Sequence, residues 1–407
     1  MNVTSGSIET RQSWVVTIAV LAIMTVSYGC PLLTSVGLPQ IAATFDDRRS
    51  IPALANALVW LGSGAGGILV GALAERIGVR AAVVFGGIMI ALGFGMSTLD
   101  GAAMLVIGHG LLVGILGTGA IHAPLYVYIS RWFDRRRGTA LALVASGQFL
   151  GGAFWPPILL FMITHWGWRV TMMLFGAIAL STVVPIALLF LKPAPADPQA
   201  PSPALQAGTP HSASPPHAVF PLLCLASVLC CIPMAMPTAH LPALCGDLGI
   251  APSTGAAMLS LLLGLGFISR QFWGWLSDRI GGLATVAAAS TCQAVAIAGF
   301  LGVQSEAGLF GVSAAFGLGF SGIIPAYILS VRELFPTSEA SWRVPLLFFC
   351  SLIGMALGGW LAGAIYDRTA SYAPALSLAL ASNLTNVCLV LFIMGFMRNA
   401  MRRPHSA

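Results

Sequence analysis

One arginine lies deep within an apolar stretch of this chain and has the clearest potential chemistry. Arg270 stands eight residues before Asp278, which places it about 12 Å from the end of a helix that rises 1.5 Å per residue. All thirteen acidic residues fall in loops, tails or the ends of apolar stretches. A guanidinium presents a planar fork of donors that matches a carboxylate. We therefore predict that Arg270 binds the carboxylate of a small organic anion; the alternative is a structural arginine satisfied by backbone carbonyls and water.

Other polar residues in apolar stretches are candidates for contact with the same ligand. His122 lies nine residues before Arg131, so its depth is about 13 Å, similar to that of Arg270. Its imidazole could hydrogen-bond a ligand or carry a proton near neutral pH, and a neutral packing role is the alternative. The further candidates are Tyr126, one turn later on the same face, and Tyr28, His240 and Tyr327. For the tyrosines the alternative is hydrogen bonding between helices.

The composition decides the class of protein that must position these residues. The chain has 407 residues, of which 57% are hydrophobic and 8% charged. Ordinary soluble domains carry about 25% charged residues, so a soluble enzyme, a nucleic-acid-binding protein and a disordered protein are excluded. No zinc-binding HExxH, phosphate loop or nucleophile elbow occurs. We predict no catalytic residue, metal or cofactor, and hence a non-enzyme embedded in the lipid bilayer.

Apolar runs of about 20 residues, the length that crosses a bilayer, recur along the whole chain. They predict an all-α membrane protein, since the alternation typical of a membrane barrel is absent. The predicted transmembrane helices are twelve: 14–38, 52–74, 79–98, 102–130, 139–164, 168–191, 219–244, 252–276, 283–303, 306–331, 342–366 and 374–397.

The basic residues predict the orientation of these helices. With the N-terminus inside, fourteen Lys and Arg residues fall in inside segments and four in outside loops. Because cytoplasmic loops carry the excess of basic residues, both termini should be cytoplasmic, in the cell (inner) membrane. The same bias explains the net charge of +6 without an anionic partner such as nucleic acid.

The chain divides into two halves that echo each other. A Pro-rich stretch predicts a cytoplasmic linker at 192–218, between six-helix bundles at 1–191 and 219–407. GALAERIG after the second helix and GWLSDRIG after the eighth both fit G-x-x-x-[D/E]-R-I-G, 203 residues apart. Four further residues recur at equivalent positions of the two halves: Gly117, Gly119, Pro124 and Phe133 in the first, and Gly317, Gly319, Pro325 and Phe335 in the second. Such a parallel repeat of six spans is typical of one class of transporter.

The duplicated loop resembles the signature of the major facilitator superfamily, and the resemblance covers the whole chain. It implies the major facilitator fold and a gating role for the loop residues, which are Gly71, Glu75, Arg76, Gly274, Asp278 and Arg279. The two glycines would permit close helix approach. The charges would bridge helices in one state and release them in another, or would only fix topology and loop shape.

A narrower resemblance concerns the residues around Arg270. GFISRQFWGWLSDRIGG, TAHLPALCGDLGI, RWFDRRRGTALALVASGQ and HWGWR look like the monocarboxylate porters and the oxalate/formate exchangers. The resemblance implies that Arg270 is the anion site and that His240 is a polar residue of the seventh span. The chain lacks the exchangers' second basic residue between Arg343 and Arg368, which argues against a dicarboxylate clamp. Proton-linked porters have an aspartate one turn before the arginine and a lysine in the first span. This chain has Gly266 at the first position and no lysine in the first span, which argues against the porters' route of proton coupling.

These features together predict a secondary active transporter of a monocarboxylate-like anion that works by alternating access. Protons or a counter-anion are the open choices for a coupled partner. One rival is an exporter of drugs or other amphiphiles, although no span offers a carboxylate for cationic cargo. The other is a membrane receptor that binds a ligand without moving it.

Overall fold

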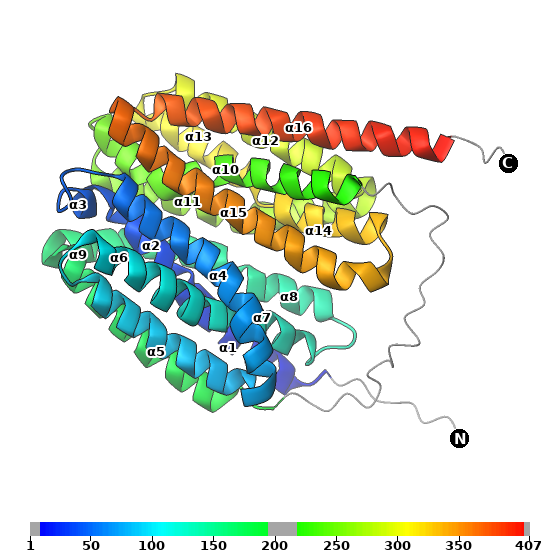
Figure 1. The fold of residues 1–407 in the computed structure, drawn as a ribbon, viewed down its shortest axis with the longest axis horizontal. Coiled ribbons are helices and arrows are strands. Elements are labelled where there is room, and N and C mark those ends of the chain that lie inside the picture. The colour runs from blue at the N-terminus through cyan, green and yellow to red at the C-terminus, as the bar shows by residue number, and fades with distance from the viewer. Residues whose placement is uncertain (1–8, 194–217, 403–407) are drawn as a thin grey trace. The chain divides into compact units, whose positions relative to one another are not determined.

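The computed structural model describes residues 9–193 and 218–402, and every element within these ranges is helical (Figure 1). Contacts divide the chain into two units. Unit 1 is Met1–Asp47 with Leu54–Ala200, and unit 2 is Arg48–Ala53 with Pro201–Ala407. The predicted linker at 192–218 lies almost wholly outside the described residues, so the predicted domain boundaries stay predictions.

Unit 1 contains several helices that are broken within a single span. The first span breaks at Tyr28, between α1 and α2, and the fourth changes to a glycine-rich π-helix, η1, before α7. The helices are α1 (Arg11–Ser27), α2 (Gly29–Val36), α3 (Leu38–Ala42), α4 (Ser50–Ile77), α5 (Val79–Ser97), α6 (Ala102–Ile107), η1 (Gly108–Thr118), α7 (Gly119–Ser130), α8 (Arg137–Ala145) and α9 (Gly147–Phe190).

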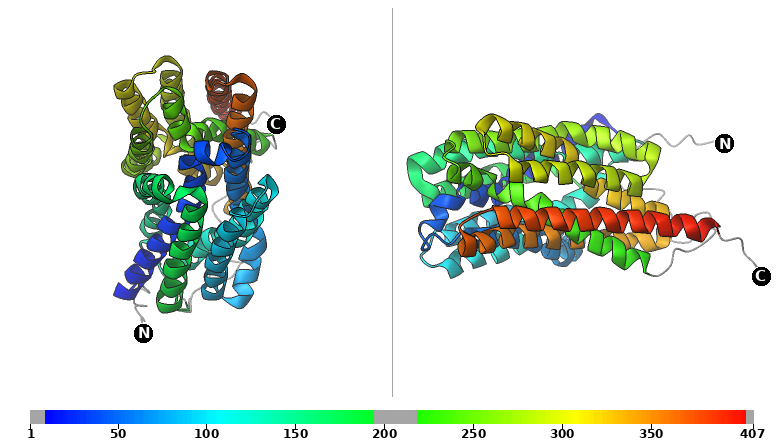
Figure 2. Two further views of the ribbon diagram at one scale, coloured as in Figure 1. Left: turned by 90° about the vertical axis from the view of Figure 1, so that its left-hand side faces the viewer. Right: turned by 90° about the horizontal axis from the view of Figure 1, so that it is seen from above.

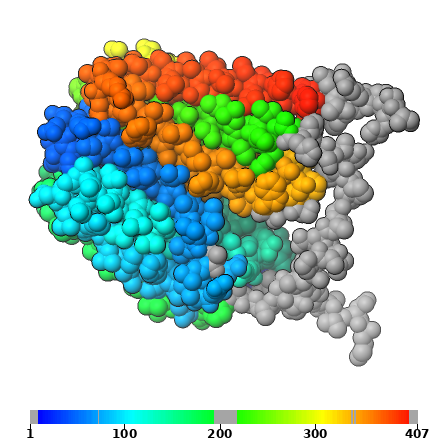
Figure 3. Space-filling model, viewed as in Figure 1, coloured from blue at the N-terminus to red at the C-terminus, as the bar shows by residue number. Residues whose placement is uncertain are grey.

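Unit 2 is built around α10, which packs against both α15 and α16. In Figure 2 α16 runs along the outside of this unit, and Figure 3 shows α10 reaching the surface between α15 and α16. The helices are α10 (Val219–Asp247), α11 (Pro252–Ile280), α12 (Gly282–Gly302), α13 (Glu306–Phe320), α14 (Ile323–Leu334), α15 (Thr337–Thr369) and α16 (Ala373–Arg402).

The described helices agree with the prediction of an all-α protein with twelve spans. Eleven candidate spans are long and apolar enough to cross a membrane. One of them, Arg137–Phe190, has 54 residues, which is more than twice the length that a bilayer needs. Gly167 breaks it with φ 77° and ψ 162°, a conformation open to glycine and foreign to a helix. This segment therefore supplies the predicted fifth and sixth spans.

The last glycine of each repeated loop motif is required by the backbone. Gly78 separates α4 from α5 with φ 86°, and Gly281 separates α11 from α12 with φ 83°. Only glycine adopts this region without steric cost. The two copies of the motif thus build the same turn, in which a single glycine separates the end of one helix from the start of the next.

Close helix packing in unit 1 uses glycines other than the one predicted. A Cβ atom added at Gly66 would collide with the carbonyl oxygen of Ile115, and one at Gly62 would lie 2.8 Å from the carbonyl oxygen of Gly110. At Gly71 and Gly274 an added Cβ would meet nothing within 4 Å. Neither glycine therefore lies at a close helix contact in this structure, and at Gly71 the helices α4 and α7 have already diverged.

A charged cluster fixes the beginning of α4 within unit 2. The Arg49 guanidinium donates to both carboxylate oxygens of Asp247, at 2.7 and 2.5 Å, and its carbon lies 3.7 Å from the centre of the Tyr366 ring. Asp367 accepts from the backbone N–H groups of Arg49 and Ser50, at 2.7 and 3.0 Å. Burial is the largest single influence on the pKa of Arg49 and lowers it, but the hydrogen bonds and charges of Asp247 and Tyr372 together raise that pKa above its usual value.

We expect Gly66→Ala to destabilise the protein, because its methyl group must displace the backbone of η1 at Ile115. Overpacking of this kind costs about 1–3 kcal/mol. The measurement is the apparent melting temperature of the purified protein in detergent. Gly71→Ala is the matched control on the same helix and should leave the melting temperature unchanged. Equal melting temperatures for both variants would contradict the packing described for Gly66.

Replacing Arg49 should cost more stability than replacing its neighbour. The Arg49 side chain is 12% exposed and Asp247 28%, and hydrogen bonds to charged groups contribute about 1.5–3 kcal/mol. Arg49→Gln should lower the apparent melting temperature, and Arg48→Gln, at an exposed residue, should not. A double-mutant cycle with Asp247→Asn isolates the pair. A coupling energy of zero would show that the cluster does not hold α4.

Candidate functional site

His122 forms a polar cluster inside unit 1 with residues of two other segments, the first span and α4. Its Nε2 lies 2.9 Å from Ser27 Oγ and its Nδ1 lies 3.1 Å from Ser63 Oγ. The Tyr28 ring stacks on the imidazole at a centroid distance of 4.2 Å and an interplanar angle of 22°. Ser27 ends α1, Ser63 lies in α4 and His122 lies in α7. The structure thus brings together two predicted site residues, His122 and Tyr28.

The hydrogen bonds of this cluster indicate one tautomer of the imidazole. Ser27 Oγ donates to the Met24 carbonyl oxygen at 3.1 Å, so it can accept the Nε2 proton of His122. Nδ1 then accepts from the hydroxyl of Ser63. Because serine hydroxyls rotate, the same partners could adapt to a changed protonation of the ring. His122 itself is half-buried.

Tyr28 lies at the junction of α1 and α2, with φ −72° and ψ −9°, and its ring stacks on His122. Tyr126 follows His122 by one turn on α7 and is also half-buried. Broken helices at membrane depth are tolerated where they border protein or a cavity, and they are typical of sites in transporter-like folds.

Arg270 lies in the middle of α11, in unit 2, and is half-buried. The preceding residue anchors the helix: Ser269 Oγ donates to the Gly317 carbonyl oxygen at 3.0 Å and lies 2.7 Å from Ser321 Oγ. Ser321 and Gly322 form the break between α13 and α14. Since consecutive helical residues point about 100° apart, this anchor fixes the direction of Arg270 away from the α13 contact.

The aromatic residues after Arg270 divide between packing and exposure. Trp273 is 5% exposed, and its Nε1 donates to the Leu318 carbonyl oxygen at 2.7 Å. Phe272 and Trp275 are 53% and 51% exposed. Trp273 therefore repeats the anchor of Ser269 one turn later, so that α11 is held to α13 on both sides of Arg270.

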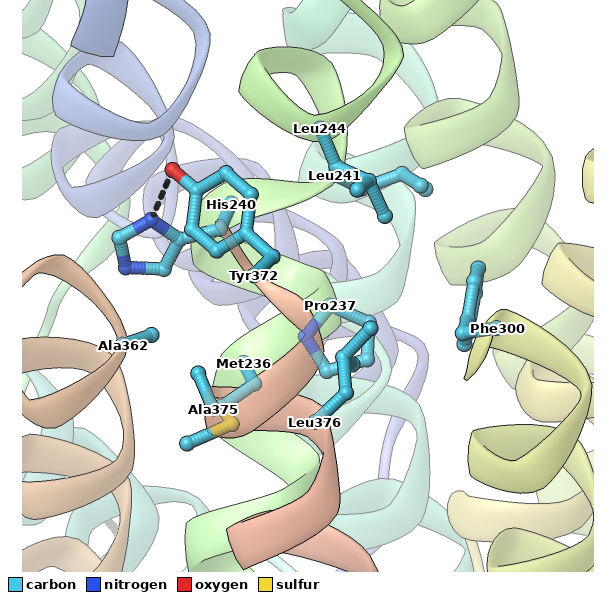
Figure 4. A pocket seen from close by; sticks show the side chains of 10 residues that line it. All are labelled: Met236, Pro237, His240, Leu241, Leu244, Phe300, Ala362, Tyr372, Ala375 and Leu376. Carbon is cyan, nitrogen blue, oxygen red and sulfur yellow. Dashed lines mark hydrogen bonds between the residues drawn. The ribbon is translucent and has the colours of Figure 1, made fainter. Parts of the chain in front are cut away.

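His240 has a different surrounding from the one predicted. Its Nε2 donates to the Gly359 carbonyl oxygen at 2.8 Å, so its Nδ1 must accept from the Tyr372 hydroxyl at 3.0 Å (Figure 4). The Tyr372 hydroxyl accepts in turn from Arg49 at 3.0 Å. Burial raises the pKa of Tyr372, which keeps this donor protonated.

The space beside His240 is too small for an organic anion. His240, Tyr372 and mostly apolar neighbours line a cavity of about 20 Å³ (Figure 4), room for one water molecule. His240 is 3% exposed, and both of its ring nitrogens are engaged by the protein. In this structure His240 belongs to the cluster of Arg49, and its predicted contact with substrate stays a prediction.

Tyr327 also has a protein partner in this structure, and its predicted contact with substrate stays a prediction. It is fully buried, and its hydroxyl donates to Asn386 Oδ1 at 2.5 Å. Asn386 Nδ2 donates to Ser290 Oγ at 2.9 Å, which joins α14, α16 and α12. This is the hydrogen bonding between helices that was the alternative for Tyr327. Asn386 and Ser290 were not predicted, although polar residues in apolar spans are the signal for such bonds.

The charged residues of the repeated loops lie at helix ends, as predicted, with partners that differ between the units. In unit 1, Glu75 pairs with Arg131 at 3.6 Å, and both side chains are exposed. In unit 2, the Arg279 guanidinium lies 4.1 Å from the Trp275 ring on the same helix. The described contacts do not test the gating role. No group of metal-ligating side chains occurs among the described residues.

Comparisons with known proteins agree with this architecture. The "Monocarboxylate transporter 11" of Homo sapiens is 31% identical over 355 residues, which cover 85% of this chain and 68% of that one. The "Monocarboxylate transporter 13" of Bos taurus is 28% identical over 304 residues, covering 74% and 70%. Each likeness is longer than either unit alone.

A solved structure shows the same fold at low sequence identity. The "peptide transporter POT in complex with sulfate" superposes with a TM-score of 0.72 at 15% identity, over 94% of this chain and 95% of that one. The family description "Major Facilitator Superfamily" matches residues 14–341, which include both copies of the loop motif. With its all-helical units and paired motif, this chain belongs to the major facilitator superfamily of transporters.

Proposed function

We propose that this chain is a secondary active transporter of a small, monocarboxylate-like organic anion that works by alternating access. Arg270 carries the proposal, because it is the charged residue of the sequence that lies away from the span ends. A charge at this depth costs at least about 2.5–3.5 kcal/mol and marks a functional site by default. The names of the two monocarboxylate transporters given above support the substrate class.

The setting of Arg270 suits a bound carboxylate. Ser269 and Trp273 hold α11 to α13, and Arg270 is half-buried between them in the sequence. A fixed helix holds the backbone of Arg270 in place, which lowers the cost of ordering its side chain on binding. The bound anion neutralises the charge, and this would ease movement of the loaded carrier.

We place the His122 cluster second, as the polar element that unit 1 contributes to anion handling. Its imidazole and two serine hydroxyls can donate or accept according to the ligand. Tyr28, stacked on the ring, and Tyr126, one turn away, complete this group. A coupled proton or counter-anion would drive uphill transport. The excess of basic residues in the predicted inside loops supports an inner-membrane protein with cytoplasmic termini.

Arg270→Lys should lose transport, because an ammonium keeps the charge but lacks the bidentate fork. Loss of one charge-assisted hydrogen bond predicts a fall of about tenfold or more in uptake. The measurement is counterflow of a labelled monocarboxylate into proteoliposomes that contain the purified full chain.

Arg332→Lys is the matched control, at an exposed residue near the end of α14, and should keep wild-type uptake. Normal carboxylate uptake by the Arg270→Lys protein would eliminate the bidentate site. Wild-type protein that binds a carboxylate without trans-stimulated uptake would instead indicate a receptor.

His122→Gln should flatten the pH dependence of transport more than it lowers the amount of folded protein. Glutamine keeps one donor and one acceptor for Ser27 and Ser63 but cannot be protonated in the working range. Uptake is measured between about pH 5.5 and pH 8. The exposed His165→Gln serves as control. A pH profile identical to wild type would remove His122 as a proton carrier.

A further inference from the structure

Unit 1 contains a cavity of about 700 Å³ that is separate from the His122 cluster. It lies where α4 ends and α5 begins, against α7 and the chain after α9. Small apolar residues form much of its wall: Gly67, Gly71, Ala74, Ala123 and Val127. The cavity exists because α4 and α7 touch at Gly66 and Gly119 and then separate, leaving open space at Gly71.

The charged residues that line this cavity are mainly positive. They are Arg80, Arg131 and Lys192, with Glu75 as the one acidic member. Arg80 Nε donates to the Leu191 carbonyl oxygen at 2.8 Å, and the Tyr128 hydroxyl donates to the Lys192 carbonyl oxygen at 2.6 Å. These bonds hold the residues that follow α9, including Lys192, at the edge of the cavity. The lining therefore favours an anionic ligand.

The internal repeat provides a second and independent observation. In unit 2, α12 begins at Gly282, whose backbone N–H donates to Glu333 Oε2 at 2.9 Å. At an offset of 202 residues the counterpart of Glu333 is Arg131, just as Phe133 answers Phe335. The start of α5 thus has an arginine where the start of α12 has a carboxylate.

Arg131 cannot accept from the start of α5 as Glu333 does from the start of α12, and the nearby Glu75 carboxylate pairs with Arg131 at 3.6 Å. Gly78 is the residue before α5 and offers no side-chain acceptor to the first turn. Helix N-termini carry a partial positive charge and orphan N–H groups. Because Gly78 and Val79 line the cavity beside Arg80 and Arg131, all of these donors border the same space.

We propose that this cavity binds the phosphate of an anionic phospholipid, which takes the place that Glu333 occupies in unit 2. The apolar wall selects a lipid over a free phosphate, because it offers room for the beginning of an acyl chain. The same flank of the molecule is apolar, since Ile68, Leu69 and Leu73 of α4 are 49–66% exposed. Basic pockets near helix ends are suited to lipid head groups.

Native mass spectrometry of the full chain in detergent tests this site, with phosphatidylglycerol as ligand and phosphatidylcholine as the uncharged comparison. Wild type should retain phosphatidylglycerol preferentially. Removing two charges in Arg80→Gln/Lys192→Gln should weaken binding about 25-fold, about fivefold per side chain. Arg131→Glu, which recreates the arrangement of unit 2, should abolish the preference. Gly71→Leu should lower retention by filling the cavity.

Arg169→Gln removes an exposed arginine elsewhere in unit 1, paired with Asp100, and should bind as wild type does. Glycerol phosphate and inorganic phosphate, added as competitors, distinguish a lipid from a free anion. If neither glycerol phosphate nor inorganic phosphate displaces the lipid at equal concentration, the result supports the lipid site. If either of them displaces the lipid, the result overturns it. Unchanged preference in both Arg131→Glu and the double variant would overturn the site altogether, provided that each variant elutes as a single species.

Discussion

The cost of an unsatisfied polar group in an apolar environment governs this structure. A chain with 8% charged residues has few charges that need a partner, and three of its polar aromatic side chains are joined across helices. Ser27 and Ser63 hydrogen-bond His122, Tyr372 and Gly359 hydrogen-bond His240, and Tyr327 reaches Ser290 through Asn386. Each of these three side chains thereby links elements that are distant in sequence, so that its hydrogen bonds help to specify which helices are neighbours.

The two units share a backbone plan but not their electrostatics. Both copies of the repeated motif end one helix and begin the next through a glycine with positive φ. The residues around that common turn have diverged: Glu333 accepts from the start of α12, whereas Arg131 pairs with Glu75 beside the start of α5. A fold built from a repeat can therefore specialise one copy while it keeps the geometry of both.

The spans could be predicted from the sequence because length and hydropathy are sufficient for them, and the predicted ends lie within a few residues of the described helices. The fifth and sixth spans illustrate this, since Gly167 separates them where two apolar runs meet. The partners of a polar residue could not be predicted in this way. His240 and Tyr327 lie on predicted helices, but they hydrogen-bond to protein partners that only tertiary packing reveals.

Gly71 and Arg49 also have surroundings that could not be predicted from the sequence. A glycine in a helix is equally compatible with a tight contact and with open space, and the difference lies in the divergence of α4 from α7. Arg49 appeared as one of four outside basic residues, because its partners Asp247, Tyr366 and Asp367 are about 200 to 320 residues away in the chain. No pattern along the sequence could have assembled them.

The glycines at 78 and 281 have a consequence for the history of the chain. Every amino-acid replacement of a glycine adds a side chain, and the backbone at these two junctions disfavours any such residue. After an ancestral duplication, the two junctions would resist drift while exposed neighbours accumulated changes freely. They are therefore natural landmarks for aligning the two halves of distant relatives, even where the flanking charges have reversed sign.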